Sequence, residues 1–525
     1  MISKIKRITA LLLTLLLMFS LFGCGNKKGE ESVDDKNNDN EPGLSAGADD
    51  VFTINCNPKF SMNPLLATNT SNQLVCNFVY ENIIDVDNTF TAVPSVASDW
   101  STEDGGQTWS LTIAPGHKFH DGANVTASDV AYSIQCAIGS DRFGKRLTNV
   151  YSAEAIGGDT VQVSLNSKNG QLPLFLSIPV IEYGTYTNAY PGGSGPYTYA
   201  NDYKSLVAFE DYYIKDAQPI DTIYLAEYNS VEEIIPAFED ALLDMVINDP
   251  TATTNLGYGS SNEIRGFNTT NMHYIGLNTH SSVFRFDSLR YIMNYAFDRE
   301  YLVKDQLNNY AELAVLPINP ISPYYSKSIA KQYEYNLTTC EVALGNAGLL
   351  DFDNDGFVEM KTDNVLSEIE IDFIVCNASS IKVNMARKFA DDMESIGLKV
   401  NVRPLSWDDY TAALTMGDFD IYYGEVRLTP DFDLTRLLMD GGSLNYGGVS
   451  SASLNELINA YLAADDKGRK DACAAMCNDI AANAYIVPLC FEKHQMITHR
   501  NVVSGITATE NNPCFNIANW EINRN

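Results

Sequence analysis

The stretch IEIDFIVCNASSIKVNMARKFADDMESIGLKVNV, from Ile369 to Val402, decides the fold class of this chain. Its apolar run at 369–375 is typical of a buried strand. The apolar positions at 381–396 follow the helical period and predict an amphipathic helix that ends at Gly397. Residues 398–402 are again strand-like, so the stretch predicts a strand, a helix and a strand in succession.

The alternation continues beyond this stretch. Ser406 predicts the start of another helix, and residues 419–426 have the composition of another strand. Strands separated by helices of this length indicate a largely parallel sheet with crossover helices. Because ligands of such sheets bind at the carboxyl ends of the strands, we expect a cleft near the loop after Val426.

The first half of the chain also mixes strands and helices. Residues 109–113 alternate between polar and apolar and predict a strand. Thr126 precedes Asp129 by three residues and predicts a capping box at the head of a helix over 127–138. Ser230 with Glu233 and Ser406 with Asp409 repeat this spacing. The fold class is therefore α/β.

Charge and length limit the possible functions. The chain has 67 acidic and 35 basic residues and a net charge of −32, which repels nucleic acids and anionic lipid surfaces. We expect no nucleic-acid partner. About 475 residues follow residue 50, too many for one core, so two or three domains are expected.

The N-terminus is typical of an exported protein. Three basic residues, Lys4, Lys6 and Arg7, precede an apolar run at 8–21, which is shorter than a membrane span. Leu21-Phe22-Gly23-Cys24 resembles the bacterial lipobox, although Phe22 stands where a small or β-branched residue is usual. We expect a signal peptide over 1–23 and a lipid on Cys24; the alternative is an ordinary secretory signal with an incidental cysteine.

Residues 24–50 are polar and charged and predict a flexible linker, so that folded structure begins near Val51. Nine further cysteines follow Cys24, without C-x-x-C spacing. Cys473 and Cys477 lie four apart in a predicted helix and are interpreted as small buried residues. No disulfide framework is expected.

A series of motifs in order along the chain resembles the family 5 extracellular solute-binding proteins. These are the oligopeptide-, dipeptide- and nickel-binding lipoproteins of ABC importers. The matching segments are Phe119-His120-Asp121-Gly122, 125–133, Gly193-Ser194-Gly195-Pro196-Tyr197, 288–299, 395–400, 417–420 and Val487-Pro488-Leu489. The resemblance covers the chain from about residue 51 to its end.

The resemblance implies a type II periplasmic-binding-protein-like clamp of two lobes with an additional inserted domain. By this likeness, domain I comprises 51–80, 188–265 and 500–525, domain II is inserted at 81–187, and domain III spans 266–499. Hinges are expected near 262–270 and 498–505, and the lobes of such proteins close on ligand.

The resemblance also implies the function. We expect a lipid-anchored, extracytoplasmic, monomeric substrate-binding protein that delivers a small solute to an ABC permease, with short peptides as the first choice. Nickel or a metallophore is the alternative ligand, and a tethered sensor or hydrolase on the same fold is the alternative class. No cofactor is expected.

Ligand contacts are expected around 420–433. Peptide-binding relatives place an aspartate there for the free amino terminus, but this chain has Arg427 or Thr429 in its place, with Glu425 and Asp431 as the nearest acids. Arg427 would favour a ligand carboxylate or carbonyl. The equally weighted alternative is that Arg427 braces its loop by pairing with Asp431 or Asp433.

Three further residues complete the expected ligand site. Trp407 and Tyr410 lie one helical turn apart and could form an aromatic wall, although core packing explains them equally well. Asn278 lies where relatives return a strand to the rim of the cleft.

Asp351-Phe352-Asp353-Asn354-Asp355-Gly356 copies the first half of a calcium-loop pattern. The twelfth position is Thr362 and lacks the required acid, so a surface turn is favoured over a calcium ion and no metal ligands are expected.

Enzymatic motifs are incomplete. Residues 139–146 approach a phosphate-binding loop, but Arg146 replaces the Ser or Thr that would hold magnesium. His120 has no partner at a spacing typical of catalysis or metal binding, and a structural role is favoured. We therefore expect a binding protein and not an enzyme.

Overall fold

The computed structural model describes residues 51–252, 257–259, 261–362 and 365–523. The expected signal peptide, Cys24 and the linker lie outside the described residues. Within the described ranges, no helix combines the length and apolar character that crossing a membrane requires.

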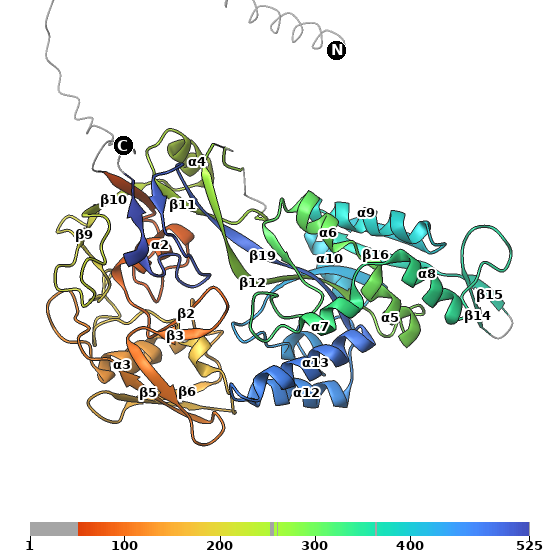
Figure 1. Cartoon of the computed structure of the whole chain (residues 1–525), viewed down its shortest axis with the longest axis horizontal. Helices are drawn as coiled ribbons and strands as arrows, with labels where there is room; N and C mark the ends of the chain where they lie inside the picture. The colour runs from red at the N-terminus through yellow and green to blue at the C-terminus, as the bar shows by residue number, and fades with distance from the viewer. Residues whose placement is uncertain (1–50, 253–256, 260, 363–364, 524–525) are drawn as a thin grey trace, which may run out of the picture. The chain divides into compact units, whose positions relative to one another are not determined.

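Eleven strands form one mixed sheet, ordered β17-β16-β18-β12-β19-β11-β1-β10-β9-β8, with β13 paired to β19 (Figure 1). Its strands are β1 (Phe52–Cys56), β8 (Tyr197–Tyr199), β9 (Ser205–Ala208), β10 (Thr222–Glu227), β11 (Met245–Asn248), β12 (Glu263–Leu277), β13 (Ala311–Leu313), β16 (Glu370–Cys376), β17 (Lys399–Leu405), β18 (Ile421–Arg427) and β19 (Ile486–Thr498).

Parallel pairing occurs in two groups of this sheet. β1 pairs in parallel with β10 and β11, and β16 pairs in parallel with β17 and β18. The long strands β12 and β19 lie between the groups and pair antiparallel with each other and with their neighbours. The prediction of a largely parallel sheet was right for β16–β18 and wrong for the centre, because β12 and β19 lie outside the regular alternation at 369–427.

β12 and β19 connect the two parts of the sheet. They pair from Glu263 with Thr498 to Gly276 with Ile486, and the register shifts between Asn268 and Met272. β11 pairs with β19 on one side of this bulge, whereas β18 pairs with β12 from Asn271 onward. At about 3.3 Å per residue, the 15 residues of β12 extend roughly 50 Å. The bulge is thus the point where the chain passes from one part to the other.

Two large hydrophobic cores lie on either side of the bulge. We call the elements around the core that contains Phe52, Phe78 and Met496 the first lobe, and those around the core that contains Phe297, Phe373 and Phe389 the second lobe. Phe297 and Phe389 stack with centroids 4.3 Å apart.

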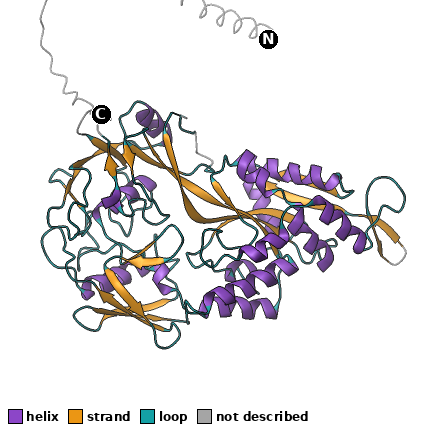
Figure 2. Cartoon of the chain, viewed as in Figure 1, coloured by secondary structure: helices purple, strands orange, loops and turns teal. Residues whose placement is uncertain are grey.

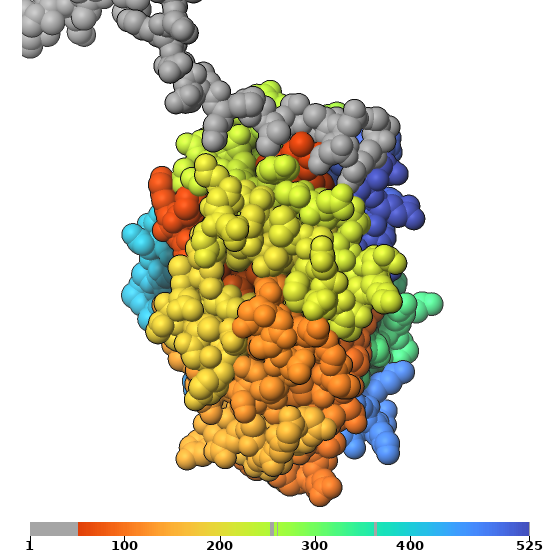
Figure 3. Space-filling model, turned by 90° about the vertical axis from the view of Figure 1, so that its left-hand side faces the viewer, coloured from red at the N-terminus to blue at the C-terminus, as the bar shows by residue number. Residues whose placement is uncertain are grey.

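The first lobe also holds a separate four-stranded antiparallel sheet, ordered β4-β5-β7-β6. Its strands are β4 (Ala97–Ser101), β5 (Thr108–Ile113), β6 (Val150–Ala155) and β7 (Thr160–Leu165). Short pairs elsewhere are β2 (Ile84–Val86) with β3 (Ala92–Pro94), β14 (Glu359–Thr362) with β15 (Val365–Glu368), and β20 (Val503–Ser504) with β21 (Glu521–Ile522). Figure 3 looks onto the first lobe, where the segments that form the four-stranded sheet, in orange, cover the lower part of the visible face.

Helices concentrate in the second lobe (Figure 2). The helices are α2 (Thr70–Val79), α3 (Ala127–Ile138), α4 (Val231–Glu239), α5 (Asp287–Ala296), α6 (Arg299–Tyr301), α7 (Lys327–Ala330), α8 (Leu337–Asn346), α9 (Ser380–Glu394), α10 (Trp407–Met416), α11 (Thr435–Leu438), α12 (Ala452–Ala463) and α13 (Arg469–Asn483). Short 3₁₀ or π turns occupy Leu172–Phe175, Leu302–Gln306, Lys331–Tyr333 and Ile517–Asn519.

The predicted helix starts agree with the structure. The Thr126 N–H donates to the Asp129 carboxylate at 2.9 Å, as a capping box requires. α10 begins after Ser406, whose hydroxyl accepts from the Asp409 N–H at 3.3 Å. α4 begins after Ser230, although Glu233 accepts from the Asn229 N–H instead of the Ser230 N–H.

Candidate functional site

The carboxyl ends of β16, β17 and β18 lie at one edge of the second lobe, because these strands are parallel. Lys382 on the first turn of α9 and Trp407 at the start of α10 follow two of these ends. Glu425 and Arg427 are on the last residues of β18. The edge therefore gathers residues separated by more than forty positions in the sequence.

Glu425 is held by two partners at this edge. The Lys382 ammonium group lies 2.5 Å from its carboxylate, and the Asn271 amide donates to it at 2.8 Å. Burial opposes the charge of Glu425, but the neighbouring His273 and Lys382 outweigh burial and lower the pKa of Glu425 to about 2. Glu425 is thus an ionised carboxylate whose charge is already compensated.

Behind Glu425 lies a buried polar chain. His273 Nε2 donates to Glu492 at 2.5 Å, and His273 Nδ1 lies 2.8 Å from the Tyr423 hydroxyl. The Asn271 amide donates to the second Glu492 oxygen at 2.5 Å. Burial opposes the ionisation of Glu492, but His273 outweighs it and lowers the pKa of Glu492. This row of hydrogen-bonded side chains lies next to the bulge between the lobes.

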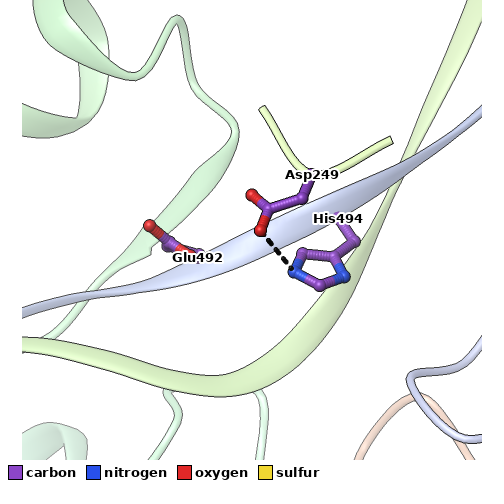
Figure 4. Close-up of side chains that lie close together, drawn as sticks. All are labelled: Asp249, Glu492 and His494. Carbon is purple, nitrogen blue, oxygen red and sulfur yellow. Dashed lines mark ion pairs between the residues drawn. The ribbon is translucent and has the colours of Figure 1, made fainter. Parts of the chain in front are cut away.

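Asp249, Glu492 and His494 converge beside the same bulge (Figure 4). Asp249 follows β11 in the first lobe, whereas Glu492 and His494 are alternate residues of β19. His494 Nε2 lies 3.7 Å from the Asp249 carboxylate, and one donor atom from each residue lies within 4.8 Å of the others. One imidazole and two carboxylates form a donor set that suits a borderline transition metal.

A cavity of about 430 Å³ opens at the carboxyl ends of the parallel strands of the first lobe. Its lining includes Asn55 near the end of β1, Asn57 and Phe60 after it, and Asp249 after β11. This cavity was not predicted from the sequence, because the parallel strands that form it are far apart along the chain. In each lobe, polar side chains thus lie at the carboxyl ends of parallel strands.

Arg427 pairs with Glu510 and not with Asp431 or Asp433. Its Nη2 atom lies 2.9 Å from the Glu510 carboxylate, which also accepts from the Thr270 N–H at 3.0 Å. The Arg427 side chain is 64% exposed, whereas that of Glu510 is 8% exposed. The predicted bracing partner was wrong because Glu510, in the C-terminal segment of the first lobe, comes within reach only in the fold.

Arg427 lies close enough to two further arginines, Arg142 and Arg146, to contribute to lowering their pKa. Burial lowers the pKa of Arg146 to about 9, Arg142 and Arg427 add to the effect, and Glu510 opposes it. Arg146 donates to the Ser177 carbonyl at 2.6 Å, but its Nε atom is buried without a hydrogen-bond partner. Arg142 donates to the Pro64 carbonyl. We call Arg142, Arg146 and Arg427 the arginine group.

The other predicted contacts are spread around this edge. Trp407 is 64% exposed and its ring centroid lies 6.2 Å from that of Tyr410. Tyr410 is buried, and its hydroxyl donates to the Tyr423 carbonyl at 2.7 Å. Asp431 is also buried, and its carboxylate accepts from the Thr429 hydroxyl at 2.6 Å. Only Trp407 of these three presents an open surface.

Asn278 lies apart from the others. Its amide donates to the Gly417 and Phe419 carbonyls at 3.2 and 3.0 Å, beyond the far end of β18. Because Asn271 pairs with Arg427, seven residues at about 3.3 Å each separate Asn278 from Arg427, roughly 23 Å. Asn278 therefore does not share a site with Arg427.

His120 has a place in the scaffold. Its Nε2 atom donates to the Gly195 carbonyl at 3.0 Å, and its ring meets Phe209 edge-on. Burial lowers the pKa of His120 to about 4, so the imidazole is neutral at physiological pH. This hydrogen bond joins two of the motif segments found in the sequence.

Comparisons with known proteins agree with this architecture. Residues 91–442 match the profile of bacterial extracellular solute-binding proteins, family 5 (middle region). The oligopeptide-binding protein AppA of Bacillus subtilis is 22% identical over 88% of this chain and 89% of its own length. Its structure with a nonapeptide covers 91% of this chain and 99% of its own, with a TM-score of 0.57.

Two other solved structures superpose more closely. The unliganded open form of the murein tripeptide-binding protein MppA has a TM-score of 0.74 at 15% identity, over 91% of this chain and 98% of its own. A nickel ABC transporter protein from Bacillus halodurans has a TM-score of 0.73 at 17% identity, over 89% and 98%. These likenesses confirm the predicted two-lobed α/β clamp.

Proposed function

This chain belongs to the bacterial extracellular solute-binding proteins of family 5, and we propose that it is a lipid-anchored receptor that captures short peptides between its lobes. Members of this family are extracytoplasmic binding proteins that work with an ABC permease, and they are not enzymes. The alternative of a tethered hydrolase is therefore excluded. We further propose that the protein acts as a monomer and delivers its ligand to that permease.

The proposed division into domains follows the cores except at three residues: Phe267 and Met496, in 266–499, pack in the core of the first lobe, and Phe90, in 81–187, packs in that of the second. Domain I would comprise 51–80, 188–265 and 500–525, with domain II inserted at 81–187, and both contribute to the core of the first lobe. Domain III, at 266–499, would comprise most of the second lobe. Closure would then bend β12 and β19 near 262–270 and 498–505, where the two strands start and end.

The arginine group carries the peptide proposal. Arg142 and Arg146 come from the first lobe and Arg427 from the second, and the nearby Glu510 carboxylate pairs with Arg427 at 2.9 Å. A locally basic group is unusual on a chain with a net charge of −32. A peptide C-terminal carboxylate would compensate this charge and form a charge-assisted, bidentate contact with Arg427.

The acidic side of the site is less available to ligand. Glu425 is already paired with Lys382 and Asn271, and Asp431 is buried. A free amino terminus would therefore find a weaker partner here than a free carboxylate would. We propose that Trp407, which is exposed at the same edge, stacks on a side chain or peptide plane of the ligand.

The test compares peptides that differ only at their C-terminus. A ligand would first be identified by mass spectrometry of peptides retained from a casein digest, and its free-acid and amidated forms would be titrated calorimetrically. Arg427→Ala should weaken binding of the free acid roughly tenfold or more and leave the amide unchanged. Arg427→Lys should lose less, because it retains the charge.

Arg436→Ala is the matched control, since Arg436 is exposed on α11 and contacts Ser443. It should bind both forms of the peptide like the wild type. Equal affinity for the acid and the amide in the wild type, or unchanged binding by Arg427→Ala, would reject the carboxylate contact. Retention of no peptide by the folded protein would reject the peptide proposal itself.

A nickel or metallophore ligand is the second candidate, favoured by Asp249, Glu492 and His494 at the bulge. Glu492 is already committed to His273 and Asn271, which weakens this candidate. Titration with nickel chloride, alone and with L-histidine, tests it. Binding that is lost in His494→Gln would favour the metal, whereas no heat from either solution would exclude it.

The lipid anchor is tested separately at Cys24. Labelled palmitate should enter the wild-type protein, and Cys24→Ala should abolish labelling and release the protein from the membrane fraction. Release of the wild-type protein into the medium without label would instead favour an ordinary secretory signal.

A further inference from the structure

Four carboxylates converge in the loop between α8 and β14, at the right-hand edge of the second lobe in Figure 1. Asp351, Asp353, Asp355 and Glu359 each place one oxygen within 4.8 Å of the oxygens of the others. Among the ion pairs formed by described residues, none includes any of these four side chains. The cluster therefore concentrates negative charge without an ion-pair partner in the part of the chain that the structure describes.

Backbone N–H groups of the loop hold the Asp351 carboxylate. The Asn354 and Gly356 N–H groups donate to the Asp351 carboxylate at 2.6 and 3.0 Å. Gly356 has a φ of 102°, a conformation in which a side chain would be strained. A glycine at this place allows the sharp turn after three alternate acids, as in the sixth position of a calcium loop.

The fourth carboxylate, that of Glu359, is buried and only partly hydrogen-bonded. It begins β14 and is only 3% exposed. One oxygen, Oε2, accepts from the Phe352 N–H at 2.7 Å, but the other, Oε1, is buried without a hydrogen-bond partner. A buried carboxylate oxygen without a partner is unfavourable unless a cation is near. This oxygen belongs to the residue that closes the acidic cluster.

We propose that this loop is a calcium site, with Asp351, Asp353, Asp355 and Glu359 as carboxylate ligands. All four donors are hard oxygens, as Ca²⁺ prefers, and the cluster has no nitrogen or sulfur donor that would select zinc. Thr362 at the twelfth position cannot provide the carboxylate of an EF-hand, and Glu359 at the ninth provides it instead. The predicted surface turn is thus part of a larger ligand set.

The site would connect two segments of the second lobe. Val358, next to Glu359, is buried, and its N–H donates to the Gly397 carbonyl at 2.8 Å. Gly397 lies between α9 and β17, so a calcium ion would hold the β14–β15 hairpin against the start of β17. Extracytoplasmic modules typically bind calcium at about 10⁻⁴ to 10⁻³ M, which suits a protein exposed outside the membrane.

The test titrates the full chain with calcium chloride after treatment with EDTA. Calcium should bind with one site per chain and raise the melting temperature by roughly 3 °C or more at saturation. Magnesium chloride should bind at least tenfold more weakly, because Mg²⁺ requires a tighter octahedral site. Glu359→Gln and Asp353→Asn should each weaken calcium binding at least tenfold.

Two variants keep the test decisive. Asp353 is exposed, so Asp353→Asn should fold even if Glu359→Gln does not. Glu341→Gln removes an exposed acid on the neighbouring α8 and should bind calcium like the wild type. The proposal is overturned if millimolar calcium gives neither binding nor stabilisation, if Asp353→Asn binds normally, or if magnesium binds equally well.

Discussion

Asp244→Asn should make the protein more stable at alkaline pH. Asp244 precedes β11 and is 1% exposed, and its carboxylate accepts from the Thr53 N–H at 2.7 Å. Burial raises the pKa of Asp244 to about 6, although the bond from Thr53 opposes this shift. Because the folded-state pKa is above the ordinary value of 3.8, ionisation of Asp244 favours the unfolded state.

The size of the effect follows from the shift. A shift of two pKa units destabilises the folded state by about 3 kcal/mol when Asp244 is ionised. This cost is present in full above pH 6 and absent well below pH 3.8. The increase in the free energy of unfolding caused by Asp244→Asn should therefore be about 2 kcal/mol larger at pH 8 than at pH 4. Any constant cost of the amide cancels in this difference.

Urea unfolding of the wild type and the variant at both pH values measures it. Asp240→Asn, at an exposed position after α4, controls for the loss of one negative charge. The reasoning is refuted if Asp244→Asn changes the free energy of unfolding equally at pH 4 and pH 8, or if Asp240→Asn shows the same pH dependence.

Three further changes test other parts of the fold. Gly276→Ala should cost about 1–3 kcal/mol, since its Cβ would overlap the Tyr422 ring on β18; an unchanged urea midpoint would contradict this packing. Since the folded-state pKa of His120 is lowered to about 4, stability should fall as pH drops from 6.5 toward 4, and His120→Gln should remove this loss from melting curves. Trp407→Ala should change unfolding by less than about 0.5 kcal/mol but weaken peptide binding in calorimetry; unaltered affinity would exclude stacking.

Local elements could be predicted from sequence because their signals are local. The apolar periods at 369–427 gave β16, α9, β17, α10 and β18 with ends displaced by one to three residues. Polar residues at strand ends, such as Glu425 and Arg427, could also be expected near a cleft, because parallel strands end at one edge.

The partners of those residues could not be predicted, because they are distant in sequence. Arg427 meets Glu510, and Asp249 meets His494, only after β11, β12 and β19 have paired. Glu359 was overlooked for a different reason. The known calcium-loop pattern places its acid at the twelfth position, whereas this fold brings in the ninth.

The long pair β12–β19 also couples the stabilities of the two lobes. Both strands contribute hydrogen bonds to each lobe, so unfolding either lobe would expose unpaired backbone groups in the other. Heating should therefore melt both lobes in a single cooperative transition. A ligand held by one lobe alone would then protect the amide hydrogens of both against exchange with solvent.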